Sequence, residues 1–136
     1  MINNEIRWKQ RFQNFEKAFE VFQRRVNAYQ LTPADESHQM SLVQAFEIII
    51  ELSWKVLKNY LEDAGVQALN SPKSVIRQAF QSKSIRNAET WMEALMLRNE
   101  TSHTYNLEVM GKVLAFVAGP FYPALRDLHH ELKSAL

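Results

Sequence analysis

The first thirty residues place aromatic and aliphatic side chains at intervals that alternate between four and three positions. Side chains spaced in this way share one face of an α-helix, and the alternation is typical of a helix packed nearly parallel to its neighbours. Aromatic rings can also form a base-stacking platform, but helical spacing favours a core stripe. We therefore predict that this stripe is buried; it consists of Trp8, Phe12, Phe15, Phe19, Phe22, Val26 and Tyr29.

The rest of the chain keeps this helical character. Only three glycines and four prolines interrupt 136 residues, and no stretch shows the alternation of apolar and polar residues that a half-buried strand would need. We predict an all-α fold, an up-and-down four-helix bundle with one extra short helix, in a single domain over residues 1–136. The predicted helix starts are Asn3 or Asn4, Thr32-Pro33, Ser71-Pro72 (the short helix), Asn87 and Asn106, and the second helix ends near Ala64 at Gly65.

The last predicted helix contains Gly119, Pro120 and Pro123. Proline lacks a backbone N–H donor, and its ring clashes with the carbonyl four residues earlier. We therefore predict a kinked last helix, with the kink near Phe116. Residues 113–122 are strongly apolar, and we expect their exposed side to form a dimer interface or a partner-protein site.

Side chains that could bind a metal are present but poorly arranged. Glu47 and Glu51 lie on one helix face, yet no Glu-x-x-His pattern accompanies them. His129 and His130 are adjacent, so on a helix they point about 100° apart and cannot easily bind one metal. We expect both histidines at the surface, no bound metal and no cofactor.

Charge and composition limit the classes of partner. The net charge is +1, from 16 basic and 15 acidic residues, which argues against a strongly basic nucleic-acid surface. Residues 66–103 are mildly positive and suit a brief encounter with RNA or nucleotide. The chain has no cysteine, no apolar signal-peptide segment at its start and no run long enough to span a bilayer, so we expect a cytoplasmic protein without membrane association.

One markedly polar segment interrupts the helical pattern. It reads Arg98-Asn99-Glu100-Thr101-Ser102-His103-Thr104-Tyr105-Asn106, without an aliphatic side chain. A helical segment this polar either lies in solvent or lines a site. Its side chains suit chemistry on a phosphate, because arginine presents a fork of donors that matches phosphate oxygens and histidine exchanges a proton near neutral pH.

The spacing within this segment raises a geometric problem. On an ideal helix Arg98, Ser102 and Tyr105 share one face, whereas Asn99 and His103 share an adjacent face. Arg98 and His103 are five positions apart, so an undistorted helix holds them about 140° from each other. Co-operation between these two side chains therefore needs a bent or ending helix, or a second copy of the chain.

The pattern Arg98-Asn99-x-x-x-His103-x-Tyr105 resembles the R-x4-H-x-Y signature of HEPN domains, which are small helical proteins encoded beside minimal nucleotidyltransferases. With Trp91 upstream and Ser102 beside the histidine, the sequence is most similar to the branch called nucleotidyltransferase substrate-binding proteins. The resemblance implies a homodimer and a partner transferase encoded by a neighbouring gene. It also implies a metal-independent endoribonuclease, the toxin of a toxin–antitoxin pair.

The resemblance also implies roles for individual residues. His103 would transfer the proton of the 2′-hydroxyl, Arg98 would hold the phosphate, and Asn99 would orient His103 or the phosphate. Ser102 would support these groups. Tyr105 matches the tyrosine to which the partner transfers AMP, and the added negative charge would silence the nuclease.

Two alternatives stay open. The chain could be a non-catalytic accessory subunit that presents substrate to the transferase. The segment could also be a structural polar patch or an inactive HEPN site, in which Arg98 pairs with Glu93, Glu100 or a carboxylate on another helix and His103 caps carbonyls at a helix end.

Overall fold

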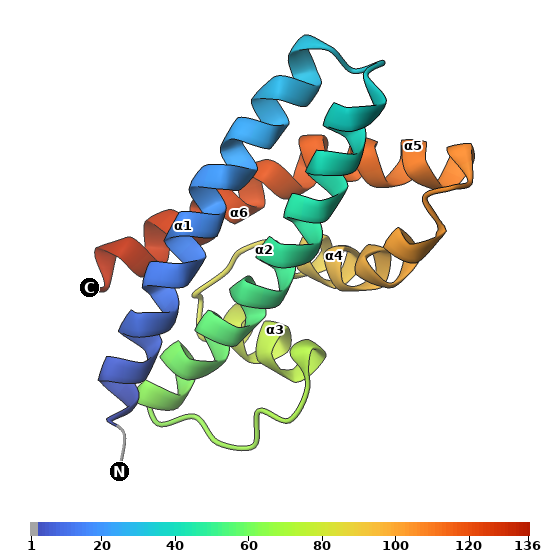
Figure 1. The fold of residues 1–136 in the computed structure, drawn as a ribbon. Helices are drawn as coiled ribbons and strands as arrows, with labels where there is room; N and C mark the ends of the chain where they lie inside the picture. The colour runs from blue at the N-terminus through green and yellow to red at the C-terminus, as the bar shows by residue number, and fades with distance from the viewer. Residues whose placement is uncertain (1–2) are drawn as a thin grey trace.

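The computed structural model describes residues 3–136, and every regular element in that range is helical (Figure 1). The predicted all-α bundle with an extra short helix and a kinked last helix is confirmed. None of the helices in the described range is long and apolar enough to cross a membrane. The elements are α1 (Asn4–Leu31), α2 (Glu36–Asp63), α3 (Pro72–Gln81), α4 (Ala88–Glu100), the 3₁₀ turn η1 (Thr101–His103), α5 (Leu107–Phe116), the π-helical turn η2 (Val117–Phe121) and α6 (Tyr122–Ser134).

Helices α1 and α2 form a long antiparallel hairpin (Figure 1). The aromatic stripe of α1 is buried as predicted, apart from Tyr29, which is half-buried. At one end of the hairpin the Trp8 and Tyr60 rings meet edge to face, with centroids 5.0 Å apart. The hairpin is therefore held together by side chains whose helical spacing is visible in the sequence.

The predicted start of α2 at Thr32-Pro33 is wrong by three residues. Thr32 ends α1 instead: both its backbone N–H and its hydroxyl donate to the Ala28 carbonyl, each at 3.2 Å. The cap of α2 is Asp35, whose Oδ1 accepts the His38 N–H at 3.0 Å. A carboxylate satisfies the free amides of a first turn and also complements the helix dipole, so Asp35 fixes the start.

The other predicted helix starts agree with the structure. Ser71 and Ser74 form a reciprocal capping box before α3, and the Asn106 side chain accepts from two amides at the start of α5. Asn87 occupies the cap position of α4 but makes no side-chain cap hydrogen bond.

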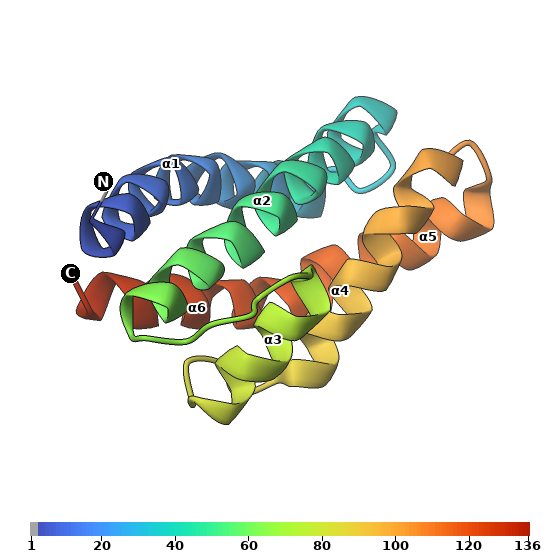
Figure 2. The same cartoon turned by 90° about the horizontal axis from the view of Figure 1, so that it is seen from below.

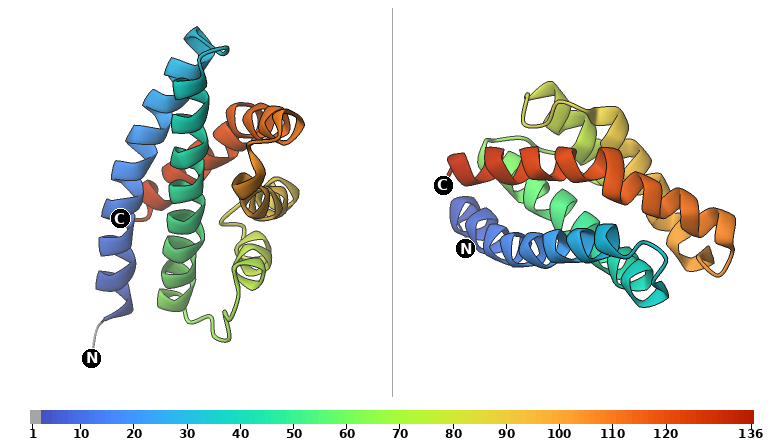
Figure 3. Two further views of the ribbon diagram at one scale, coloured as in Figure 1. Left: turned by 45° about the vertical axis from the view of Figure 1, so that its right-hand side comes forward. Right: turned by 90° about the horizontal axis from the view of Figure 1, so that it is seen from above.

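The second half of the chain crosses the hairpin. In the left view of Figure 3, α1 and α2 stand upright while α4 and α5 are seen nearly end-on. Figure 2 shows α5 running back beside α4 after the turn between them. The kink lies at η2, directly after Phe116, where Gly119 leaves helical geometry at φ −97° and ψ −109°.

Phe121 in η2 joins the two layers. Its ring meets Phe22 of α1 at 5.8 Å, Phe46 of α2 at 5.1 Å and Trp91 of α4 at 5.4 Å between centroids. These edge-to-face contacts fix α4, and with it the polar segment, against the hairpin.

The expectation of an exposed apolar seam over residues 113–122 is wrong for the large side chains. Phe116 and Phe121 are buried, and so are Val113, Leu114 and Val117. The exposed positions of this run carry the small residues Ala115, Gly119 and Pro120, and Tyr122 is half-buried.

Candidate functional site

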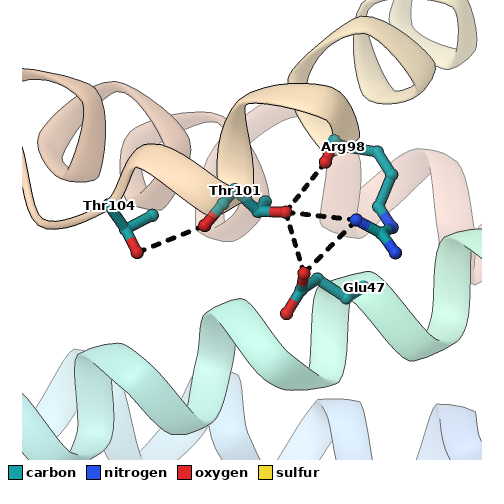
Figure 4. Close-up of polar contacts among 4 residues, drawn as sticks. All are labelled: Glu47, Arg98, Thr101 and Thr104. Atoms are coloured by element: carbon teal, nitrogen blue, oxygen red, sulfur yellow. Dashed lines mark hydrogen bonds and ion pairs between the residues drawn. The ribbon is translucent and has the colours of Figure 1, made fainter.

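Arg98 lies in the last turn of α4 and is tied to α2. Its Nη1 donates to Glu47 Oε2 at 3.3 Å, and the Thr101 hydroxyl contacts the same carboxylate oxygen at 2.9 Å (Figure 4). Thr101 Oγ1 also lies 2.8 Å from the Arg98 carbonyl, at the helix end. One carboxylate therefore holds both the arginine and the turn that ends α4.

The guanidinium of Arg98 is only partly engaged by this network. Its side chain is 37% exposed, and its Nε is buried without a hydrogen-bond partner among residues 3–136. Arg98 and the exposed Asn99 line an open hollow of about 550 Å³ between α2, α3 and α4. The ion pair between Arg98 and Glu47 of α2 agrees with one part of the alternative in which the polar segment is a structural patch, namely that Arg98 pairs with a carboxylate on another helix.

His103 stands at the other end of the segment, in the open. It ends η1, and its Nδ1 lies 3.3 Å from the hydroxyl of Tyr105. The two rings meet edge-on, with centroids 5.9 Å apart, and Tyr105 is 82% exposed. No carbonyl-capping hydrogen bond from the imidazole is present in residues 3–136, so the other half of the structural-patch alternative is not observed.

His103 and Tyr105 line a separate hollow of about 420 Å³. Its lining includes Lys112 and Glu100, whose charged atoms lie 3.5 Å apart. The start of α5, which Asn106 caps, also lines this hollow. An imidazole and a phenol are thus both open to a ligand from solvent.

One chain does not bring Arg98 and His103 to the same hollow. The helix does end between them, at Glu100, as one of the sequence-based options required, yet the two side chains line different surface depressions. Ser102 is exposed on η1 and lines neither hollow. Within a monomer the predicted residues therefore form two groups, Arg98 with Asn99 and His103 with Tyr105.

Two residues of the site were not predicted. Glu47 lies 51 positions from Arg98, and Thr101 was not assigned a role within the polar segment. Glu47 and Glu51 recur at helical spacing, which marks one face of α2 but does not identify the partner across the bundle. Among residues 3–136, no group of three or more histidines and carboxylates is arranged to hold a metal ion.

The structure corrects the expectation for His129, whereas His130 is exposed as predicted. The His129 side chain is only 17% exposed and stacks on Phe19 of α1 at 4.4 Å between ring centroids. Its Nε2 lies 2.7 Å from Glu16 Oε2, and since a carboxylate only accepts, the nitrogen carries the proton. This hydrogen bond is the main reason why the pKa of Glu16 falls below its ordinary value of 4.5.

Known proteins with similar sequences or structures include a nuclease relative. Residues 10–134 match the family model described as nucleotidyltransferase substrate binding protein like. A curated Haemophilus influenzae protein named probable ribonuclease HepT is 33% identical over 73 residues, which cover 48% of this chain and 48% of that protein. The matched region thus spans about half the length of this curated relative.

A crystal structure of a protein from Thermus thermophilus has the same fold. It superposes with a TM-score of 0.74 at 28% sequence identity, over 88% of this chain and 97% of that one. The helical arrangement described above is therefore shared almost from end to end.

Proposed function

The chain belongs to the nucleotidyltransferase substrate-binding protein-like family, a branch of the HEPN domains, and on that premise we propose that it is a metal-independent endoribonuclease. The observation that carries this proposal is the open pair of His103 and Tyr105, placed just after Arg98. An exposed imidazole can approach a 2′-hydroxyl from solvent, which a histidine committed to the core cannot do.

In the proposed reaction His103 removes the proton of a ribose 2′-hydroxyl. The 2′-oxygen then attacks the adjacent phosphorus, the bond to the 5′-oxygen breaks, and that oxygen takes a proton from water. The products are a 2′,3′-cyclic phosphate and a 5′-hydroxyl end. Arg98 stabilises the extra negative charge on the phosphoryl oxygens, and Asn99 orients the phosphate.

A homodimer supplies the geometry that a single chain lacks. Arg98 and His103 line separate hollows, so the site that we propose combines Arg98 and Asn99 of one copy with His103 of the other. A two-fold axis near the end of α4 would create two such clefts or one shared cleft. Ser102 is exposed and lies in the sequence between Asn99 and His103, so it would line the cleft where the two copies meet.

Regulation would act through Tyr105. We propose that a small nucleotidyltransferase, encoded beside this gene, transfers AMP from ATP to the exposed phenol oxygen and releases pyrophosphate. The new phosphate lies next to His103 and carries negative charge, so it would repel an RNA phosphate and obstruct the imidazole. This pairing makes the protein the toxin and the transferase the antitoxin, both in the cytoplasm.

The alternative is an accessory subunit that binds substrate for the transferase without cleaving RNA. The observation in its favour is the network of Arg98, Thr101 and Glu47, which gives the arginine a structural task. The matched variant Glu47→Gln tests whether Arg98 acts only through this ion pair, because the variant breaks the pair and leaves Arg98 in place.

The test of cleavage uses purified full-length protein, single-stranded RNA and EDTA. We expect products with 2′,3′-cyclic phosphate ends, loss of cleavage in Arg98→Ala and in His103→Ala, and retention in Glu47→Gln. Cleavage that persists in both alanine variants removes these residues from the mechanism. No cleavage by wild-type protein leaves the accessory subunit as the better description.

The test of the shared site mixes two inactive variants. If Arg98 of one copy acts with His103 of the other, exchanged dimers of Arg98→Ala and His103→Ala should regain about a quarter of wild-type activity, since half of the dimers are mixed and each has one intact cleft. If the two variants are shown to exchange subunits and the mixture is still as inactive as each variant alone, the proposed shared site is wrong. The site would then lie within one chain, or these residues would form no site.

The test of modification incubates the chain with the neighbouring transferase and ATP. We expect the mass of one AMP on Tyr105 and none on Tyr105→Phe. An adduct on another residue, or no adduct and no complex on a sizing column, contradicts the proposed regulation.

A further inference from the structure

The small net charge conceals a basic surface, and of its cations the cleavage mechanism uses only Arg98. A hollow of about 250 Å³ between α1 and α2 is lined by Arg7 and Arg11 from α1 and by Lys55 and Lys58 from α2. The hollow beside Arg98 is lined by two further cations, Lys73 and Arg77 of α3. Figure 1 shows α2 between α1 on one side and α3 and α4 on the other, so the two hollows flank the same helix.

Helical spacing joins these hollows along the solvent-facing side of α2. Glu51, Lys55, Lys58 and Glu62 recur at intervals of four, three and four, so they share one face of the helix. Glu47, the partner of Arg98, precedes them on that face. From Glu47 to Lys58 the helix rises by about 16 Å, so a short stretch of polymer could touch both hollows.

Charge is concentrated along this face. Seven of the 16 basic side chains belong to the two hollows, together with only three carboxylates, counting Glu47. The rest of the chain therefore has nine basic and twelve acidic residues. All three carboxylates are engaged: Glu47 pairs with Arg98, Glu51 lies 4.0 Å from Lys55 Nζ and accepts from Trp54 Nε1, and Glu62 accepts from Asn59 Nδ2. The other five cations of the two hollows form no ion pair among residues 3–136. The face is thus positive on a molecule that is otherwise slightly negative.

Two further features of the α1–α2 hollow suit a nucleic-acid strand. Trp8 and Trp91 are buried, whereas Trp54 is half-buried and lines the hollow, with Lys55 Nζ 5.9 Å from its ring. Asn59 is only 5% exposed, and its Oδ1 has no hydrogen-bond partner among residues 3–136. A buried acceptor without a donor is costly, and a small movement of the Asn59 side chain toward the hollow would let a ribose hydroxyl or a base N–H supply the donor.

We propose that the solvent-facing side of α2 is a track for single-stranded RNA, which guides the strand from the α1–α2 hollow to Arg98. Cations would follow the phosphates and Trp54 would offer a ring for stacking, the combination that binds single strands without sequence preference. An acidic protein surface would also match the cations, but a tryptophan ring among several cations favours a strand whose bases can stack on it. The proposal rests on the ribonuclease activity proposed above and adds where the substrate lies.

The experiment measures binding of a fluorescent oligouridylate of about 12 nucleotides, a length within the range of known single-strand sites, to full-length protein carrying His103→Ala. The test pair is Arg7→Gln with Arg11→Gln; the matched control is Arg24→Gln with Arg25→Gln, the same change on exposed positions of the same helix. We expect the test pair to weaken binding about tenfold and to lower the slope of log affinity against log salt by about 1.4, from two lost phosphate contacts. The control should change neither.

Tryptophan fluorescence gives a second readout. Trp54 is the most accessible of the three tryptophans, so bound RNA should quench it and protect it from acrylamide, and Trp54→Phe should remove most of this signal. Equal losses in test and control pairs, or tight binding without a Trp54 signal, overturn the track.

The outcomes separate the track from the cleavage proposal. If wild-type protein cuts RNA but the test pair binds it normally, the track is wrong and the nuclease stands. If nothing is cut while the test pair still loses RNA binding, the track stands on a non-catalytic RNA-binding protein. Normal RNA binding combined with a lost transferase complex would make the same face a protein-docking surface instead and overturn the track.

Discussion

His103 and His129 are the same side chain beside an aromatic ring, in opposite surroundings. His129 stacks face to face on Phe19, with 20° between ring planes, and its Nε2 donates to Glu16. His103 meets Tyr105 edge-on, at 77°, and touches a hydroxyl rather than a carboxylate. The first joins α6 to α1, and the second lies at the surface between α4 and α5.

The difference shows what makes a histidine structural or available. A ring packed on phenylalanine and bonded to a carboxylate has a face and its proton committed to the fold. A ring at the surface, whose Nδ1 contacts an exposed phenol, keeps its Nε2 open to a ligand. Four sets of variants test whether His129 serves the fold and His103 serves RNA cleavage.

The largest effect is expected for His103→Ala. Loss of a general base should lower the rate of RNA cleavage by about 10²- to 10⁴-fold, because proton transfer from the 2′-hydroxyl then depends on water. The thermal midpoint should stay within the error of the measurement, since the ring is exposed. A large drop in the midpoint would show that His103 also supports the fold and would erase the contrast with His129.

The next effect concerns the rings beside the two histidines. Phe19→Ala removes a buried ring and should lower the free energy of unfolding by about 3–5 kcal/mol, measured by urea denaturation. Tyr105→Ala removes an 82% exposed ring, and the change should stay within about 0.5 kcal/mol. Similar losses in both variants would mean that the α4–α5 junction is packed far more tightly than its exposure indicates.

His129→Ala should give a smaller but clear loss. The variant removes a hydrogen bond to a charged group and the stacking on Phe19, so we expect about 1–3 kcal/mol of destabilisation and unchanged RNA cleavage. The neighbouring His130→Ala is the control and should stay within about 0.5 kcal/mol, because His130 is exposed. Reduced cleavage at full stability in His129→Ala would break the division between the two histidines.

The smallest effect is the dependence of stability on pH at Glu16. The hydrogen bond from His129 lowers its pKa in the folded state, so its stabilising contribution is complete above the ordinary value of 4.5 and is lost as the pH falls through the folded pKa. Glu16→Gln should therefore flatten the acid side of the stability profile, by at most about 1 kcal/mol for a pair near the surface. Parallel profiles for both proteins would remove Glu16 as a source of the pH dependence.

The sequence predicted what depends on local spacing. The stripe from Trp8 onward, the helix start at Ser71 and the kink near Phe116 follow from rules that act within a few residues. The rule for Thr-Pro pairs failed at Thr32 because a better cap, Asp35, follows closely.

The sequence did not predict contacts between distant helices. Glu47 lies 51 positions from Arg98, and Glu16 lies 113 positions from His129, so neither pairing leaves a local signal. The segment from Arg98 to Tyr105 was identified by its polarity and by the family signature, but the separation of its residues into two hollows depends on how α4 ends against α2. The even overall charge likewise gave no hint that the cations gather along one side of α2.

The exposure of Tyr105 has a consequence for how such a protein could be controlled in a cell. A bulky group attached to its oxygen would displace water and the surface contact with His103 but no core side chain, so attaching or removing it would leave the lifetime of the fold unchanged. The amount of protein and its working state could then be set independently, and a modified population could be stored intact and returned to use without new synthesis.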